Sequence, residues 1–235
     1  MDRRPQHGFT LIELLVALFA LSLLAMLSWR GIDGMVRARE QTRERADQVQ
    51  ALQVGLAQWS ADLDALATVP QMSSLDWNCR VFRILRAAPD DPGQGIVVVA
   101  WSRRADGGGS RWMRWQSPPA VTRGQLDDAW RRADAWSQNS GMDGGADAVA
   151  ITGLVDWQVF FYRSDAWTNP LSSDTTQAST TAPPVTAGTA PVVTTPQTAI
   201  TPDGVRIVLT LAPGQAISGD LTRDWVSPTV GGRKS

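Results

Sequence analysis

The chain begins MDRRPQHG (residues 1–8) and continues FTLIELLVALFALSLLAMLSW (residues 9–29). The second stretch is apolar apart from Glu13 and a few small hydroxyl side chains. As an α-helix its length of about 31 Å would match the hydrocarbon core of a bilayer. We therefore expect residues 9–29 to be the membrane-spanning part of an N-terminal helix, with Arg3 and Arg4 ahead of it on the cytoplasmic side.

Glu13 is the residue that an ordinary membrane segment does not explain. A cleaved secretory signal would have a shorter apolar region and a small-x-small exit. A plain anchor accounts for the length, but a carboxylate in lipid costs about 2.5–3.5 kcal/mol on insertion scales. Glu13 is therefore a candidate functional residue.

The segment GFTLIE (residues 8–13) resembles the cleavage and N-methylation motif of type IV prepilins and type II secretion pseudopilins. In that family a prepilin peptidase cuts after the glycine, and the new N-terminal residue is methylated. The resemblance implies that residues 1–8 are a leader, that cleavage falls between Gly8 and Phe9, and that Phe9 is N-methylated. It also implies an assembly role for Glu13, whose carboxylate would pair with the terminal amine of a neighbouring subunit.

Helical periodicity continues beyond the apolar span. Six apolar residues recur at spacings of three and four: Val49, Leu52, Leu56, Trp59, Leu63 and Leu66. This stripe predicts that residues 30–70 are an amphipathic continuation of the N-terminal helix, ending before Pro70 and packing on its own domain in preference to a coiled coil. Alternating charges at residues 37–47 indicate a solvated face. Gly31 and Gly34 are compatible with a bend, with local melting or with plain helix.

Short β-prone runs separated by turn residues follow Pro70, at residues 81–86, 96–101, 111–115, 149–162 and 205–211. A second helix is expected after Thr122, which has the capping-box partner Gln125. The predicted fold class is α+β, with a long N-terminal membrane-spanning helix packed on a mostly antiparallel sheet. Residues 71–171 and 203–226 would form the periplasmic sheet domain. Residues 172–202 form a Thr/Pro/Ala-rich insertion that we predict to be disordered, and residues 227–235 a loose tail.

This architecture is also that of pilins. The segments SWRGIDG (residues 28–34), VDWQVFFY (residues 155–162) and GVRIVL (residues 204–209) resemble the J-class minor pseudopilins of type II secretion. That resemblance implies a single-pass subunit of the bacterial inner membrane that helps to initiate or cap a periplasmic pseudopilus for protein export. Its partners would be the prepilin peptidase, other minor and major pseudopilins and inner-membrane lipid.

Composition argues against other classes of function. A formal net charge of −1 does not suit a nucleic-acid binder. His7 is the only histidine and Cys79 the only cysteine. A chain cleaved after Gly8 would have no histidine, which excludes Ser-His-Asp and Cys-His catalysis and His-ligated metals. We expect no enzymatic activity, no cofactor and no small-molecule substrate, and we expect Cys79 to be a small, partly buried side chain.

The remaining acidic and aromatic residues have simple interpretations. The pairs Asp62/Asp64, Asp90/Asp91 and Asp127/Asp128 lack a third ligand at calcium-loop spacing. Whether Asp143 and Asp147 hold calcium or form a solvated turn is left open. The many tryptophans suggest sugar binding, but Trp59, Trp130 and Trp157 lie on apolar faces, where packing is the expected role.

Two other functions compete with secretion. One is a minor pilin of a type IV pilus, acting in adhesion, motility or DNA uptake; many such pilins close a C-terminal loop with a cysteine pair, which a chain with one cysteine cannot do. The other is a membrane-anchored periplasmic binding protein, which would have no need of Glu13.

Overall fold

The computed structural model describes residues 9–88, 92–139, 147–163, 165–171 and 201–228. The predicted leader, Asp90/Asp91, Asp143, nearly all of the Thr/Pro-rich insertion and residues 229–235 lie outside these ranges. The chain divides into two compact units, Met1–Asp47 and Gln48–Ser235. One helix, α1 (Leu11–Asp64), contributes to both units and runs as α-helix through Gly31 and Gly34.

The second unit contains an antiparallel sheet of eight strands in the order β1-β2-β3-β4-β5-β7-β8, with β6 paired to β5. The strands are β1 (Leu75–Trp77), β2 (Val81–Ala87), β3 (Ile96–Asp106), β4 (Gly109–Gln116), β5 (Ala148–Arg163), β6 (Ala166–Thr168), β7 (Gly204–Leu211) and β8 (Gly219–Val226). A short 3-10 turn, η1 (Pro92–Gln94), precedes β3. The α+β class and the five expected strands are confirmed, whereas β1, β6 and β8 were not predicted.

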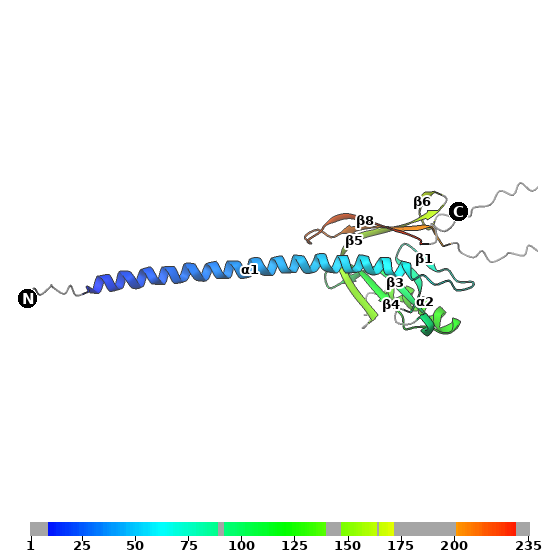
Figure 1. Ribbon diagram of the computed structural model, residues 1–235, viewed down its shortest axis with the longest axis horizontal. Helices are drawn as coiled ribbons and strands as arrows, with labels where there is room; N and C mark the ends of the chain where they lie inside the picture. The colour runs from blue at the N-terminus through cyan, green and yellow to red at the C-terminus, as the bar shows by residue number, and fades with distance from the viewer. Residues whose placement is uncertain (1–8, 89–91, 140–146, 164, 172–200, 229–235) are drawn as a thin grey trace, which may run out of the picture. The chain divides into compact units, whose positions relative to one another are not determined.

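Strand β5 divides the sheet into two branches. Its first part, Ala148–Gly153, pairs with β4, and its second part, from Leu154 to Tyr162, pairs with β7. Irregularities in the pairing lie on both sides of this change of partner. In Figure 1, β3 and β4 lie on one side of the C-terminal part of α1, while β8 lies on the other.

The C-terminal part of α1 is buried between the two branches. Its Leu52, Trp59 and Leu63 belong to a core that includes inward-facing residues from both branches: Phe82, Ile84, Val97, Val99, Trp101, Trp112, Leu154, Trp157, Val159, Phe161, Val205, Ile207, Leu209, Leu211 and Trp225. The stripe predicted for residues 49–66 therefore packs on its own domain, because this sheet surrounds it with apolar side chains.

The other face of the first branch is covered by α2 (Arg123–Gln138). Successive strand residues point to opposite faces, so Phe82 and Ile84 face α1 while Val81 and Leu85 face α2. The predicted capping box is present: Thr122 accepts from the Gln125 amide, and the Gln125 side chain accepts from the Thr122 amide.

Gly55 allows α1 to lie close to β5. A Cβ atom at this position would be 2.5 Å from Ile151 Cγ2 and 3.4 Å from a ring carbon of Trp112. Glycine is otherwise unfavourable in a helix interior, by about 1 kcal/mol relative to alanine. Close helix–sheet contact is the structural reason for glycine at this position.

Candidate functional site

Helix α1 begins with a reciprocal pair of side-chain contacts between Thr10 and Glu13. The Glu13 carboxylate accepts hydrogen bonds from the Thr10 amide (3.3 Å) and the Thr10 hydroxyl (3.1 Å). In return the Glu13 amide donates to Thr10 Oγ1 (3.4 Å). This is the arrangement of a capping box, and the spacing T-x-x-E was the signal in the sequence that would have predicted it.

Glu13 is therefore hydrogen-bonded to Thr10 but is not buried. Its side chain and that of Phe9 are both exposed, and Gly8 lies outside the described residues. From Leu11 to Val36 the apolar side chains of α1 are also exposed within their unit. Among the described residues, α1 is the one helix long and apolar enough to cross a membrane.

A buried carboxylate, Asp62, joins the other end of α1 to three adjacent strands. Arg114 of β4 forms a two-pronged contact with it, with both N–O distances 2.8 Å. Arg86 of β2 forms a second ion pair, and Trp101 Nε1 of β3 donates to Asp62 at 3.0 Å. Gln58, one turn earlier in α1, donates at 2.8 Å. Because both arginines point their charge at one carboxylate, Asp62 is a structural anchor and its oxygens are occupied.

Asp64 binds the opposite branch. Its carboxylate accepts a hydrogen bond of 2.8 Å from Trp225 Nε1 on β8. Two carboxylates two residues apart in the sequence therefore hold the end of α1 to both branches of the sheet. Sequence reasoning considered Asp62/Asp64 only as an incomplete calcium pair and missed this role, because the partners are distant in sequence.

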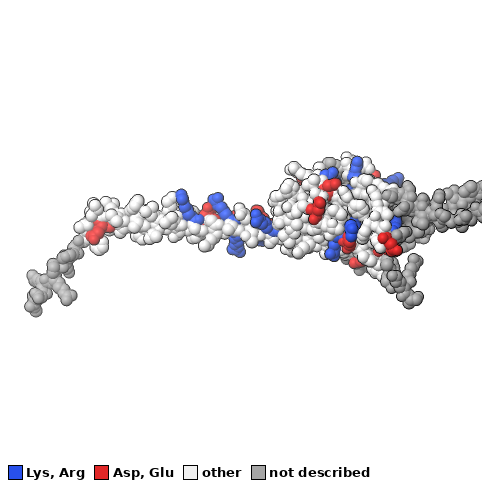
Figure 2. Space-filling model, turned by 90° about the horizontal axis from the view of Figure 1, so that it is seen from above, with Lys and Arg blue, Asp and Glu red and all other residues white. Residues whose placement is uncertain are grey.

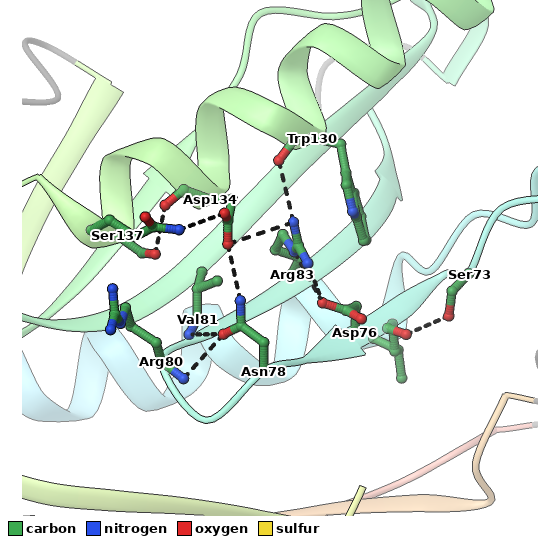
Figure 3. Close-up of polar contacts among 11 residues, drawn as sticks. Ser73, Asp76, Asn78, Arg80, Val81, Arg83, Trp130, Asp134 and Ser137 are labelled. Atoms are coloured by element: carbon green, nitrogen blue, oxygen red, sulfur yellow. Dashed lines mark hydrogen bonds and ion pairs between the residues drawn. The ribbon is translucent and has the colours of Figure 1, made fainter. Parts of the chain in front are cut away.

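A second polar cluster fastens α2 to the β1–β2 hairpin (Figure 3). The Arg83 Nε donates to Asp76 at 3.1 Å, and its guanidinium lies 4.7 Å from the ring centre of Trp130 on α2. Asn78 donates to Asp134 at 2.9 Å. In these contacts polar side chains of the β1–β2 hairpin and of α2 serve as partners for one another. They therefore indicate packing of α2 and give no sign of a reactive centre.

Cys79 lies in the turn between β1 and β2 and is exposed. The prediction of a partly buried Cys79 is therefore wrong. The Asn78 side chain accepts from the amides of Arg80 (3.1 Å) and Val81 (2.9 Å), which tightens the turn and places Cys79 at a positive φ of 67°. A backbone bent in this way directs the side chain away from the core.

The other singled-out residues lie apart from one another. Trp59 and Trp157 are buried in the main core, and Trp130 is partly buried beneath Arg83, as packing roles require. Asp127 and Asp128 form helical ion pairs with Arg123 and Arg131. The described ranges contain no cluster of three His, Cys, Asp or Glu residues with the geometry of a metal site.

One exposed ion pair shifts the pKa values of both of its side chains. Arg206 on β7 forms a two-pronged contact with Asp224 on β8, with both N–O distances 2.7 Å. The hydrogen bonds from Arg206 lower the pKa of the Asp224 carboxyl below its ordinary value. The same contact raises the pKa of Arg206.

Comparison with known proteins gives a match at the N-terminus. Residues 3–29 match the prokaryotic N-terminal methylation motif. No curated protein sequence gives a significant match. A chain in the crystal structure of the GspK-GspI-GspJ complex from the enterotoxigenic Escherichia coli type 2 secretion system is 11% identical, with a TM-score of 0.43, covering 76% of this chain and 96% of that chain. That TM-score is too low to establish a shared fold by itself.

Proposed function

Starting from the N-terminal methylation motif in residues 3–29, we propose that this chain is a minor pseudopilin of a type II secretion system. It would be cut after Gly8, N-methylated at Phe9 and held in the inner membrane by α1. The sheet domain would lie in the periplasm, where the subunit helps to initiate or cap the pseudopilus.

The motif is the observation that carries this proposal. It explains the carboxylate at position 13, which neither a secretory signal nor a plain anchor requires. The contacts of Asp62 and Asp64 are consistent with a structural subunit, since they join the helix to both branches of the sheet. We prefer secretion over a surface pilus because the chain has a single cysteine. The C-terminal disulfide loop of many type IV pilins needs two cysteines.

Processing is the first test of the proposal. In a host that has a prepilin peptidase, the intact mass of the purified protein should correspond to a chain that starts at methylated Phe9. The Gly8→Ala variant should keep residues 1–8. Retention of the leader in the unsubstituted protein, together with an unchanged product from Gly8→Ala, would contradict the proposal.

A test of the assembly role of Glu13 needs variants that separate the charge of its side chain from its capping function. Glu13→Gln removes the charge but keeps an amide oxygen that can accept from Thr10, as glutamine does in capping boxes. Thr10→Ala removes the capping hydroxyl and leaves the carboxylate. Both variants should still be cleaved and inserted, because neither adds a charge to the span.

We expect Glu13→Gln to reduce cross-linking to the other pseudopilins and export of secreted protein by several-fold, while Thr10→Ala has a smaller effect. The physical reason is that only the carboxylate can neutralise the terminal amine of a neighbouring subunit. Normal cross-links and normal export by Glu13→Gln would remove Glu13 from the assembly mechanism. A tip position, with no neighbour above, would make the defect partial.

A further inference from the structure

The sheet has one long open edge. Its two end strands are β1, which has three residues, and β8, which has eight. Just after β8, the Ser227 amide donates to the Asp203 carbonyl, which precedes β7. Successive residues of an antiparallel strand direct their main-chain groups to opposite edges. Residues 219, 221, 223 and 225 therefore bond to β7, while residues 220, 222, 224 and 226 direct their N–H and C=O groups to the free edge.

No described strand covers this edge. Within the described ranges β8 pairs with β7 alone, and no hydrogen bond is recorded to the outward main-chain groups of residues 220, 222, 224 and 226. The strand is about 27 Å long at 3.4 Å per residue. Unpaired main-chain groups of this kind let an extended segment of another chain add to the sheet as a further strand.

The next strand position adjoins a part of α1 that has small side chains. Ala57, Ala61 and Asp64 are exposed and are spaced four and three residues apart, so they share one side of the helix. Asp64 bonds to Trp225, so this side of α1 adjoins β8. A strand added about 4.8 Å beyond β8 would approach the two alanines, whose methyl groups leave space for its side chains.

Arg223 determines the charge that a docking segment must carry. Directly opposite residues share a face of a sheet, so the pairing of Arg223 with the buried Ile207 places its side chain on the face turned to α1. Arg223 is exposed there, because β8 is an end strand, and it has no recorded side-chain contact within the described part of the chain.

The carboxylates of β8 are on the opposite face and have other partners. Asp220 accepts from the Thr210 hydroxyl at 2.7 Å, and Asp224 binds Arg206. Figure 2 views the domain from the β8 side of Figure 1 and shows acidic and basic side chains together on this surface. An inward-facing charge on an end strand opposes pairing with a segment that brings no counter-charge. The edge is therefore selective for a segment with a carboxylate.

We propose that the free edge of β8 is a docking site for another subunit of the filament, which contributes an extended segment with a carboxylate opposite Arg223. The segment adds to the sheet as a strand, and its inward side chains cover Ala57 and Ala61. This inference rests on the proposed function, which supplies the partner, a different pseudopilin. One free edge holds one segment, so the contact does not propagate through copies of this chain.

A second copy of β8 does not meet the requirement. Antiparallel pairing of two such edges keeps the faces aligned. Arg223 would then lie opposite Gly219, Leu221, Arg223 or Trp225 of the other copy, depending on the register. None of these residues brings a carboxylate, and opposed arginines repel each other. The charge on the edge therefore favours a different chain.

Co-purification with other pseudopilins tests the proposal. The full-length chain is expressed with a prepilin peptidase and with the other pseudopilins of its secretion system, and is extracted in mild detergent. The measured quantity is the fraction of each pseudopilin that co-purifies with the tagged chain. Intact mass of the chain reports cleavage separately, so a failure of docking is distinguishable from a failure of the proposed function.

Thr222→Pro removes an N–H group from the free edge and none from the ladder with β7, a position at which an end strand tolerates proline. It should reduce co-purification several-fold, because the added strand loses a donor and meets the proline ring. Thr222→Ala is the matched control, since it keeps the N–H group and should bind normally. The melting temperature of each extracted full-length variant, followed by tryptophan fluorescence, checks that the domain is folded.

Arg223→Glu tests the charge without changing the main chain. It should reduce co-purification several-fold, because two carboxylates would then face each other, whereas Arg223→Lys keeps the positive charge and should retain most of the binding. Normal co-purification by both Thr222→Pro and Arg223→Glu would overturn the docking site and leave the proposed function standing. Cleaved, unsubstituted chain that binds no other pseudopilin would overturn both.

Hydrogen exchange read residue by residue identifies what occupies the edge. In the isolated full-length chain the amides of Asp220, Thr222 and Asp224 should exchange fast, and in the complex with the other pseudopilins they should be protected at least ten-fold. The amides of Leu221 and Arg223, which bond to β7, should be slow in both states. Slow exchange of the edge amides in the isolated chain would mean that another segment of the chain or a second copy covers β8, and would overturn the proposal.

Discussion

Asp62 shows how much of this fold depends on one side chain. Its carboxylate is buried and is the shared counter-charge of Arg86 and Arg114, whose side chains are only 9% and 14% exposed. Asp62→Ala should lower the free energy of unfolding by about 3–5 kcal/mol, because it leaves two largely buried guanidinium groups without their anion. Denaturant unfolding of the fragment 31–235, followed by tryptophan fluorescence, measures this loss.

Asp64→Ala is the matched control for that experiment. Asp64 is exposed and makes one recorded hydrogen bond, to Trp225, so its removal should cost about 1 kcal/mol. Equal losses in the two variants would show that the Asp62 cluster is not the main polar anchor of α1.

Gly55 tests the close approach of α1 to β5. In Gly55→Ala the new methyl group would overlap Ile151, and the cost of overpacking, about 1–3 kcal/mol, should outweigh the gain in helix propensity of about 1 kcal/mol. Gly124→Ala on α2 has open space around its Cβ position and should be neutral or slightly stabilising. Both changes can be compared in thermal melts. A Gly55→Ala protein as stable as Gly124→Ala would mean that β5 moves away at little cost.

At the scale of elements, the ion pair between β7 and β8 predicts how the Asp224 carboxyl titrates. Arg206 lowers the pKa of Asp224, so the ionised carboxylate is favoured in the folded state. Its contribution to stability is therefore present above the unfolded-state pKa and is lost as the pH falls through the folded-state pKa. Arg206→Gln should move the Asp224 pKa back towards its ordinary value, as measured by carboxyl NMR.

Arg223→Gln provides the comparison for this titration. Arg223 is also on β8 but has no recorded contact with Asp224 among the described residues, so this change should leave the Asp224 pKa lowered. An unchanged Asp224 titration in Arg206→Gln would show that the two-pronged contact does not persist in solution.

At the scale of the whole molecule, the Thr/Pro-rich insertion should contribute little to stability, because such sequence buries little apolar area. Strands β6 and β7 pair with opposite edges of β5, so a replacement linker needs enough length to join them. We expect replacement of residues 175–201 by a Gly/Ser linker of about ten residues, with a reach of about 33 Å, to leave the melting temperature nearly unchanged. A large decrease, measured by thermal melting of the fragment 31–235, would show that the insertion packs on the domain.

Local patterns in the sequence determined the parts of this protein that depend on neighbouring residues. An unbroken apolar run and the motif at residues 8–13 predict the membrane segment and the proposed processing site. Short β-prone runs separated by turn residues predicted five of the strands, and Thr122 with Gln125 predicted the start of α2. These features could be predicted because the direction of side chains along an element, and helix capping, depend on residues only a few positions apart.

Only the tertiary structure decided which distant residues meet. Asp62 and Arg114 are 52 residues apart, and Asp64 and Trp225 are 161 apart, so no periodicity in the sequence connects them. The change of partner along β5 and the short or polar strands β1, β6 and β8 likewise depend on pairing with strands elsewhere in the chain. The physical reason is that a buried carboxylate or an added strand is stabilised by groups that folding brings together. The residues next to it in the sequence do not indicate which distant groups these are.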